Sequence, residues 1–192
     1  MGETAASFPN PIYAREILEV NFHEAQKAMF GHMQAANEAH ILMLVEQGIV
    51  SREDGAALFR AFAEVEAAGP YAFAYEPKVE DLFFAVEGKV IALTGVDVGG
   101  NLQIARSRND LAAGMSRLYL RERSLQAQRA VMEFRAVLLD LAEQHIHTLM
   151  PGITHTQPAQ PTTLAHYLLG VLGPLERDSQ RLREGFARLN QS

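Results

Sequence analysis

The sequence predicts an all-α protein, with an N-terminal helical domain over residues 1–100 and the first long helices of a central helical bundle over residues 101–192. Two observations predict this fold. Apolar residues recur at helical spacing from residue 13 to residue 93, and leucines repeat every seven residues beyond residue 109. The chain is 48% hydrophobic and 21% charged, as is usual for globular proteins, and its length is sufficient to bury a core.

The first part of the chain is expected to hold an arm and two helices. Prolines at 9 and 11 disfavour helix at the residues before them, so residues 1–12 are predicted to be extended. Residues 13–48 carry apolar side chains mostly at helical spacing. Gly31 is the predicted interruption between two helices in this range.

Two further helices are predicted before residue 100. Ser51, followed by acidic residues, is typical of a helix N-cap, and Gly69 is expected to end that helix. The apolar pattern over residues 79–93 predicts the next helix, which ends at Gly95. Residues 95–101 contain three glycines and are interpreted as a turn.

A long helix is predicted from about residue 109 to residue 147, and another after residue 161. Both carry apolar columns with seven-residue spacing, which is typical of helices buried in a bundle. The columns are Leu111, Leu118, Leu125, Met132, Leu139 and Ile146, and then Leu168, Leu175, Leu182 and Leu189. Residues 150–161 include three prolines and cannot be helical throughout. Because two helices cannot cover both columns, further helices are expected from additional sequence or from an oligomer.

Composition excludes several classes of protein. The net charge of −6 and the absence of tryptophan argue against a nucleic-acid partner. The longest apolar stretches, residues 41–45 and 168–175, are far shorter than the ~20 residues that span a membrane, so a membrane protein is excluded. The chain has no cysteine and no recognisable leader sequence, and a cytoplasmic location is therefore expected.

The segment that enters the long helix could bind an anion. Ser107 and Asp110 have the spacing of a helix N-cap and its third residue. Arg106 and Arg108 add positive charge to the N-terminal end of the helix dipole, and Asn109 could contact a polar substrate group. Within this segment alone, a capped helix with two solvated arginines explains the same residues.

A second candidate lies in the proline-rich segment. Thr154, His155 and Gln157 place an imidazole beside hydroxyl and amide groups, which suits proton transfer or binding. The alternative is an ordinary polar surface. A metal site is not expected, because His145 and His147 are two residues apart and point in different directions on a helix.

Two segments together resemble a known family. Residues 99–110 (GGNLQIARSRND) and 150–161 (MPGITHTQPAQP) are similar to two signature regions of the argininosuccinate lyase family, in the fumarase/aspartase superfamily. Glu80-Asp81-Leu82 also fits its N-terminal part. The resemblance implies a mostly helical homotetramer around a central bundle, which eliminates an amine from a succinyl group to give fumarate.

The resemblance also implies roles for residues of both segments. Ser107, Arg108 and Asn109 would bind a carboxylate of a dicarboxylate substrate, with Arg106 supporting them. No cofactor is implied.

In the second segment, the resemblance makes Thr154 a hydrogen-bond donor to the substrate and Gln157 a second polar contact. His155 would transfer a proton or orient the base. Removal of a proton beside a carboxylate would form an aci-carboxylate dianion, which helix N-termini and arginine or asparagine donors would stabilise more than the ground state.

The chain departs from the family at substrate-facing positions. It has Gln103-Ile104-Ala105 where the family has His-Thr-Gly, and Phe83 where the family commonly has a histidine that reaches the substrate. Thr156 and Pro158 replace Leu and Arg. We therefore expect a divergent lyase of argininosuccinate-lyase type, which eliminates arginine from an N-substituted aspartate. The alternative is a sibling lyase of the superfamily that acts on another N-substituted aspartate.

The family's catalytic serine loop, S-S-x-M-P-x-K-x-N, has no match in residues 1–192. We therefore expect this chain to be an N-terminal portion of a longer lyase and to be inactive alone. The alternative from another class is a non-catalytic helical protein that serves in oligomerisation or structure.

Overall fold

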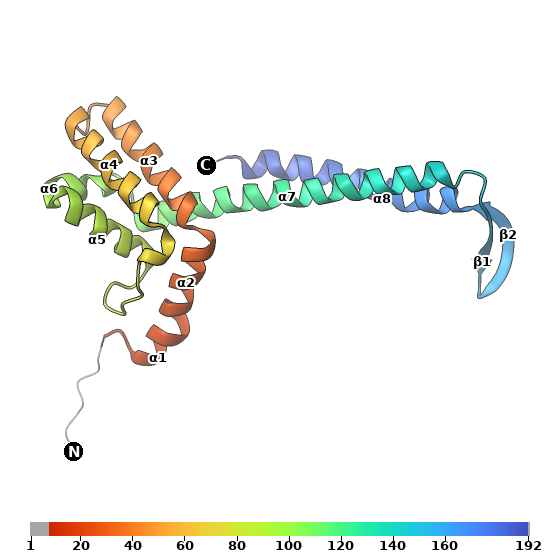
Figure 1. Ribbon diagram of the computed structural model, residues 1–192, viewed down its shortest axis with the longest axis horizontal. Helices are drawn as coiled ribbons and strands as arrows, with labels where there is room; N and C mark the ends of the chain where they lie inside the picture. Colours follow the sequence, from red (N-terminus) through yellow and green to blue (C-terminus); the bar gives the residue numbers. More distant parts are fainter. Residues whose placement is uncertain (1–7, 192) are drawn as a thin grey trace, which may run out of the picture. The chain divides into compact units, whose positions relative to one another are not determined.

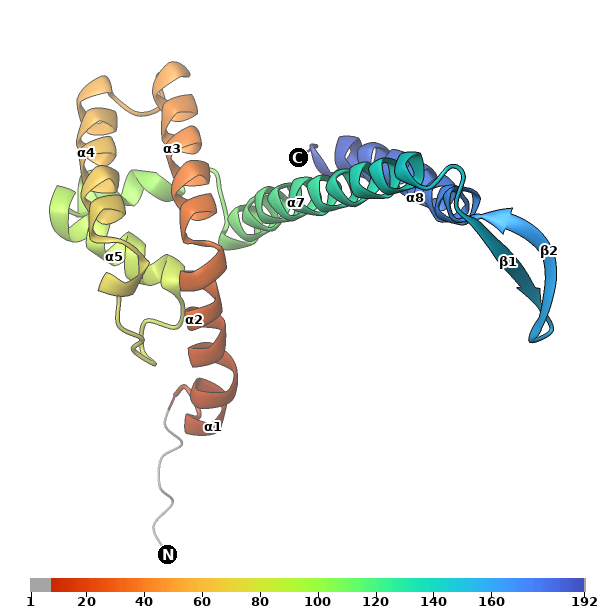
Figure 2. The same ribbon diagram turned by 45° about the vertical axis from the view of Figure 1, so that its right-hand side comes forward.

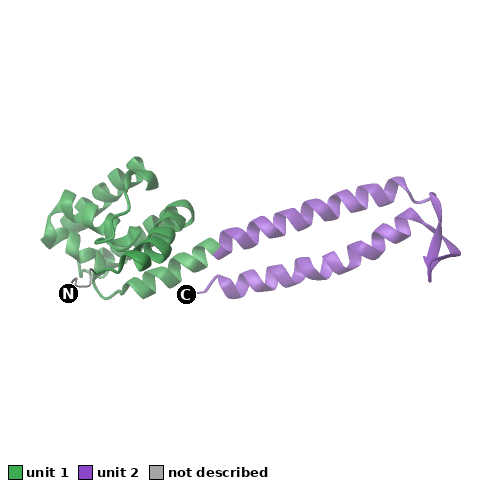
Figure 3. Ribbon diagram, turned by 90° about the horizontal axis from the view of Figure 1, so that it is seen from below, with its two compact units in different colours: residues 1–119 green, residues 120–192 purple. Residues whose placement is uncertain are grey.

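The computed structural model describes residues 8–191. It divides into two compact units, residues 1–119 and 120–192 (Figure 3). Nearly all of its regular structure is helical, and the predicted all-α class is confirmed. The boundary between the units falls inside one long helix, whereas the sequence predicted domains over 1–100 and 101–192. That division into domains stays a prediction.

Unit 1 consists of helices around one apolar core, with α3 and α4 side by side (Figure 1). Its elements are α1 (Pro11–Tyr13), a π-helical turn (Ala14–Leu18), α2 (Glu19–Ala28), α3 (Phe30–Glu46), α4 (Arg52–Ala68), α5 (Leu82–Thr94), α6 (Val96–Gly99), 3-10 turns at Pro70–Ala72 and Gly100–Gln103, and the first turns of α7. Side chains at most 1% exposed include Phe22, Ile41, Leu44, Leu58, Phe62 and Val86.

The start of the chain differs from its prediction. Residues 1–7, which carry most of the predicted arm and the region searched for a leader, lie outside the described residues. Pro11 begins α1 instead of continuing an extended segment, because proline suits the first helical position and Asn10 caps it through a 2.9 Å bond to the amide of Ile12. The break between α2 and α3 falls at Met29, two residues before Gly31.

Local capping signals were predicted correctly for α4. The hydroxyl of Ser51 accepts a hydrogen bond from the amide of Asp54 at 3.0 Å, and the helix ends before Gly69, whose φ is +77°. The next helix, α5, begins at residue 82 and not at residue 79. Its N-cap is Asp81, which accepts a 3.0 Å bond from the amide of Phe84.

The predicted turn over residues 95–101 is wrong. After Gly95, at φ +84°, the chain forms α6 and a 3-10 turn. A Cβ at Gly99 would lie 2.7 Å from Cγ1 of Ile91. Glycine therefore permits α6 to lie directly against α5, a close approach that spacing along the sequence did not indicate.

Unit 2 contains most of α7 (Arg108–Gln144), a hairpin of β1 (Leu149–Thr154) and β2 (Gln157–Thr163), and α8 (Leu164–Leu189) (Figure 2). The two long helices confirm the helical part of the prediction. The proline-rich segment is non-helical, as expected, but it forms an antiparallel hairpin that was not predicted. A two-stranded sheet has only edge strands, where proline is tolerated. No described helix is long and apolar enough to cross a membrane.

The seam between α7 and α8 is not the predicted leucine column of α7. Its small apolar core consists of Leu138, Ala142, Ala165 and Leu168. Polar contacts continue the seam: the side chain of Arg135 contacts Ser179, at 3.1 Å, and Glu176. From residue 120 onwards the predicted α7 column is largely uncovered, with Leu125, Met132, Leu139 and Ile146 between 47% and 53% exposed.

Candidate functional site

The N-terminus of α7 is closed by the predicted capping residues. The hydroxyl of Ser107 accepts hydrogen bonds from the amides of Asn109, at 3.2 Å, and Asp110, at 3.3 Å. In return, a carboxylate oxygen of Asp110 accepts the amide of Ser107 at 2.8 Å. The pKa of Asp110 is lowered, first by this backbone N–H and then by the Ser107 hydroxyl. The capping box predicted from the spacing is confirmed.

This cap changes what the helix terminus can offer to a ligand. Because the amides of Asn109 and Asp110 already donate to Ser107, they do not point freely at an anion. The groups that could meet a carboxylate are the side chains of Ser107, Arg108 and Asn109, all of which are exposed. An anion at this candidate site would therefore be held mainly by side chains.

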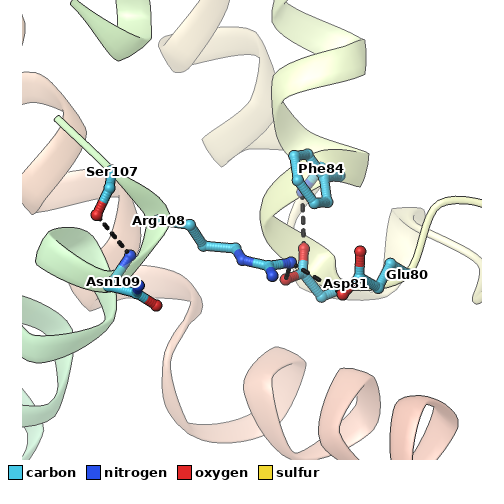
Figure 4. Close-up of polar contacts among 6 residues, drawn as sticks. All are labelled: Glu80, Asp81, Phe84, Ser107, Arg108 and Asn109. Atoms are coloured by element: carbon cyan, nitrogen blue, oxygen red, sulfur yellow. Dashed lines mark hydrogen bonds and ion pairs between the residues drawn. The ribbon is translucent and has the colours of Figure 1, made fainter. Parts of the chain in front are cut away.

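Arg108 extends from the first turn of α7 to the start of α5 (Figure 4). Its Nη1 lies 2.9 Å from a carboxylate oxygen of Asp81 and 3.2 Å from one of Glu80. Its guanidinium carbon lies 5.0 Å from the centroid of the Phe84 ring, which is within cation–π range. Burial lowers the pKa of Arg108, but the hydrogen bonds and charges of Glu80 and Asp81 outweigh this and raise it.

The residues that pair with Arg108 lie at an unusual point of the backbone. Glu80 has φ +73°, which is uncommon for a residue with a side chain. The next residue, Asp81, uses one oxygen to cap α5 and the other to bind Arg108. The N-termini of α5 and α7 are therefore joined by one carboxylate.

Arg106 is directed differently from Arg108. Its Nη2 donates to the side-chain oxygen of Asn37 at 2.7 Å and to the carbonyl of Leu102 at 3.3 Å. Burial lowers the pKa of Arg106, against the opposing charges of Glu87 and Asp110. The side chain therefore supports the segment before α7 from the protein side, and a direct substrate contact by Arg106 stays a prediction.

A pocket of about 240 Å³ lies beside the candidate site. Arg108 and Asn109 are among its polar lining residues, and Met29, Met33 and Phe83 are among its apolar ones. Phe83 is 7% exposed and packs in the core of unit 1. The position at which the resemblance implies a histidine is therefore occupied by an apolar side chain.

The second candidate group lies at the tip of the hairpin. Thr154 and Gln157 are paired across the strands, and His155 and Thr156 form the two-residue turn between them. Both turn residues have positive φ, +48° and +65°, as a type I′ turn requires. Asn and Gly are the usual residues there, and a β-branched threonine at this φ is strained. His155 is exposed at this strained tip.

The structure thus gathers the predicted residues into two groups, one in each unit. Ser107, Arg108 and Asn109 share the start of α7, and the Thr154–Gln157 group shares the hairpin tip. Within residues 8–191, no cluster of three or more histidine, aspartate and glutamate side chains is arranged to hold a metal ion.

Sequence reasoning missed the pairing of Arg108 with Glu80 and Asp81, and the contacts of Asn37 and His40 with the segment before α7. Asp81 precedes an apolar run as an N-cap residue does, so its capping role could have been found. Asn37 and His40 carried no local signal, because their partners lie more than 60 residues away.

A model of a family described as lyase matches residues 14–192. The chain belongs to this lyase family. It is 39% identical over 166 residues to argininosuccinate lyase 1 of Shouchella clausii, covering 86% of this chain and 33% of that protein. It is 45% identical over 168 residues to argininosuccinate lyase of Natronomonas pharaonis, covering 88% and 34%. The predicted resemblance is confirmed, and the chain spans about a third of the length of these relatives.

Solved structures of lyases share the fold. EDDS lyase in complex with formate is 33% identical with a TM-score of 0.76, over 89% of this chain and 34% of that one. A fumarate lyase from Mesorhizobium sp. BNC1 has a TM-score of 0.71 at 22% identity, over 93% of this chain and 43% of that one, which supports the fold alone.

Proposed function

We propose that this chain is the N-terminal part of a carbon–nitrogen lyase that eliminates an amine from an N-substituted aspartate and releases fumarate. Argininosuccinate, which releases arginine, is the first substrate to consider. The proposal is supported by the relatives named argininosuccinate lyase, which are 39% and 45% identical to the chain. The observation that carries it is the group of Ser107, Arg108 and Asn109 at the capped start of α7.

These side chains suit a carboxylate of the substrate. Arg108 can form paired hydrogen bonds to a carboxylate, and Ser107 and Asn109 supply neutral donors. Removing the proton next to the carboxylate places more negative charge on its oxygens. Donors that are already positioned stabilise that charge more in the transition state than in the ground state.

The excess of carboxylates around Arg108 supports a site to which other parts of the full protein contribute cationic groups. Arg108 is paired with Glu80 and Asp81, and Asp110 adds another negative charge to the same turn. A dicarboxylate would meet more negative than positive charge here and needs further cationic groups. We propose that residues outside this chain, including the catalytic serine loop, and neighbouring subunits supply them.

His155 is the proposed proton-transfer or base-orienting residue, with Thr154 and Gln157 as polar contacts to the substrate. The exposed position and the strained turn support this assignment, because strained backbone is concentrated at functional sites. The two-residue turn fixes the backbone of His155 at the tip of the paired strands, which suits a group that must be presented to a substrate at a defined position.

Two alternatives remain. Ile104 and Phe83 stand at positions where the family has polar side chains, which favours a sibling lyase with another N-substituted aspartate as substrate. The half-exposed column on α7 favours a homo-oligomer, and in the second alternative the chain acts only as a helical assembly module. A cytoplasmic location is expected in each case.

Fumarate release tests the proposal. The protein expressed from the full reading frame that contains these residues is mixed with argininosuccinate and then with other N-substituted aspartates. Fumarate from argininosuccinate supports the named substrate, and fumarate only from another aspartate supports the sibling lyase. No fumarate from any of them contradicts the proposal and favours the assembly module.

A further inference from the structure

The segment immediately before the candidate site is a strained turn. The carbonyl of Gln103 accepts the amide of Arg106 at 3.1 Å, which closes a four-residue turn. Ile104 has φ −55° and ψ 127°, and Ala105 has φ +55°, as in a type II turn. Glycine is the usual residue at the position of Ala105. An alanine there stays in this conformation only if the surrounding structure holds it.

Helix α3 holds this turn at two points. Asn37 accepts a hydrogen bond from Nη2 of Arg106 at 2.7 Å, and Nε2 of His40 lies 3.0 Å from the carbonyl of Ile104. Asn37 and His40 are three residues apart and therefore lie on one face of the helix. This face binds one side chain and one backbone group of the same turn.

The burial of Asn37 has a cost in free energy, which its hydrogen bond with Arg106 must offset. Asn37 is fully buried, and its Nδ2 has no hydrogen-bond partner among residues 8–191. A buried polar atom without a partner destabilises the fold, and an apolar residue would remove this cost but would leave Arg106 without its acceptor. What asparagine provides, and leucine would not, is the acceptor for Arg106.

We infer that Asn37 and His40 are positioning residues for substrate binding: through Arg106 and the Ile104 carbonyl they fix the turn at residues 103–106 and so orient Ser107, Arg108 and Asn109. The inference rests on the proposed function. The turn ends at the residue before the N-cap of α7, so a change in its backbone moves the cap and the substrate-binding side chains together.

Kinetics of the full-length protein test the inference. Asn37→Leu removes the acceptor at nearly constant volume, and we expect KM to rise about tenfold while kcat changes little, because misplaced carboxylate donors weaken binding. Asn37→Asp keeps an oxygen facing Arg106 and is expected to restore a KM near that of the wild type.

Gln34→Leu is the matched control. Gln34 lies three residues earlier on α3 and is 4% exposed. It donates a hydrogen bond to the carbonyl of Phe62 and not to the turn at residues 103–106. We expect this variant to keep the wild-type KM. An unchanged KM in Asn37→Leu, or an equal rise in Gln34→Leu, would overturn the inference.

A second measurement does not depend on lyase activity. In the 192-residue chain, hydrogen exchange of the Arg106 amide reports whether the turn is closed. Asn37→Leu is expected to accelerate this exchange, and Gln34→Leu is not. If the wild type releases no fumarate, the proposed function fails, whereas equal exchange in both variants contradicts the positioning role.

Discussion

At the scale of single residues, the candidate site depends on side chains with two partners. Asp81 caps α5 with one oxygen and binds Arg108 with the other, and Ser107 caps α7 and also stands among the proposed substrate contacts. A substrate carboxylate that binds Arg108 must compete with Asp81 and Glu80. On the proposed function, substrate affinity therefore depends on the carboxylates of Glu80 and Asp81, which hold Arg108.

His40 predicts a pH dependence of stability. Burial and then the charge of Arg106 lower its pKa below the ordinary value, so the unfolded chain binds a proton more readily than the folded chain. The stability that neutral His40 contributes is present above about pH 6.5 and is lost as the pH falls toward the folded-state pKa. NMR titration of the imidazole should give a midpoint below 6.5. A midpoint at or above that value would contradict this prediction.

At the scale of elements, the signals that predicted structure correctly are local. Ser51, Gly69 and the Ser107–Asp110 pair act on residues within four positions, so spacing alone located the helix ends. The hydrogen bonds of Arg106 to Asn37 and of Arg108 to Asp81 connect residues 69 and 27 positions apart and could not be read from spacing.

The hairpin was missed for a related reason. Its two-residue turn contains His155 and Thr156 instead of the usual Asn and Gly, and its strands contain three prolines. Local preference therefore pointed away from a hairpin. The positive φ values of this turn conflict with the preferences of its residues, and the turn includes His155, to which the resemblance assigns proton transfer.

Relieving that strain should stabilise the hairpin. Thr156→Gly removes the clash of a β-branched residue at φ +65°, and we expect a gain of about 1 kcal/mol in the free energy of unfolding. Thr162→Gly, within β2, is the matched control and should lose roughly 0.5–1 kcal/mol. Urea unfolding measures both. A loss of stability in Thr156→Gly would show that the turn is not strained.

At the scale of the whole molecule, the sequence predicted helices that cannot cover one another. The structure agrees for unit 2, where half-exposed Leu125 and Leu139 lie outside the small core between α7 and α8. The predicted column was correct in spacing, but α8 does not cover it. Hydrophobic periodicity identifies an apolar face without identifying its partner.

Self-association through this face can be measured directly. We expect the chain to sediment as an oligomer, and the double change Leu125→Glu and Leu139→Glu to lower its mass without reducing helical content, because a charge on an apolar contact is unfavourable. Ala130→Glu, exposed on α7 on the side away from the column, should leave the mass unchanged. A monomeric wild-type chain would contradict the prediction for this chain.

The most direct test of the lyase account is turnover of the full-length protein with and without the His155 imidazole. We expect His155→Asn to reduce the rate of fumarate release by about 100-fold or more, the usual contribution of a proton-transfer group, with helical content unchanged by circular dichroism. Unchanged fumarate release in His155→Asn would contradict the assignment of the catalytic group, and no release by the wild type from any N-substituted aspartate would contradict the lyase itself.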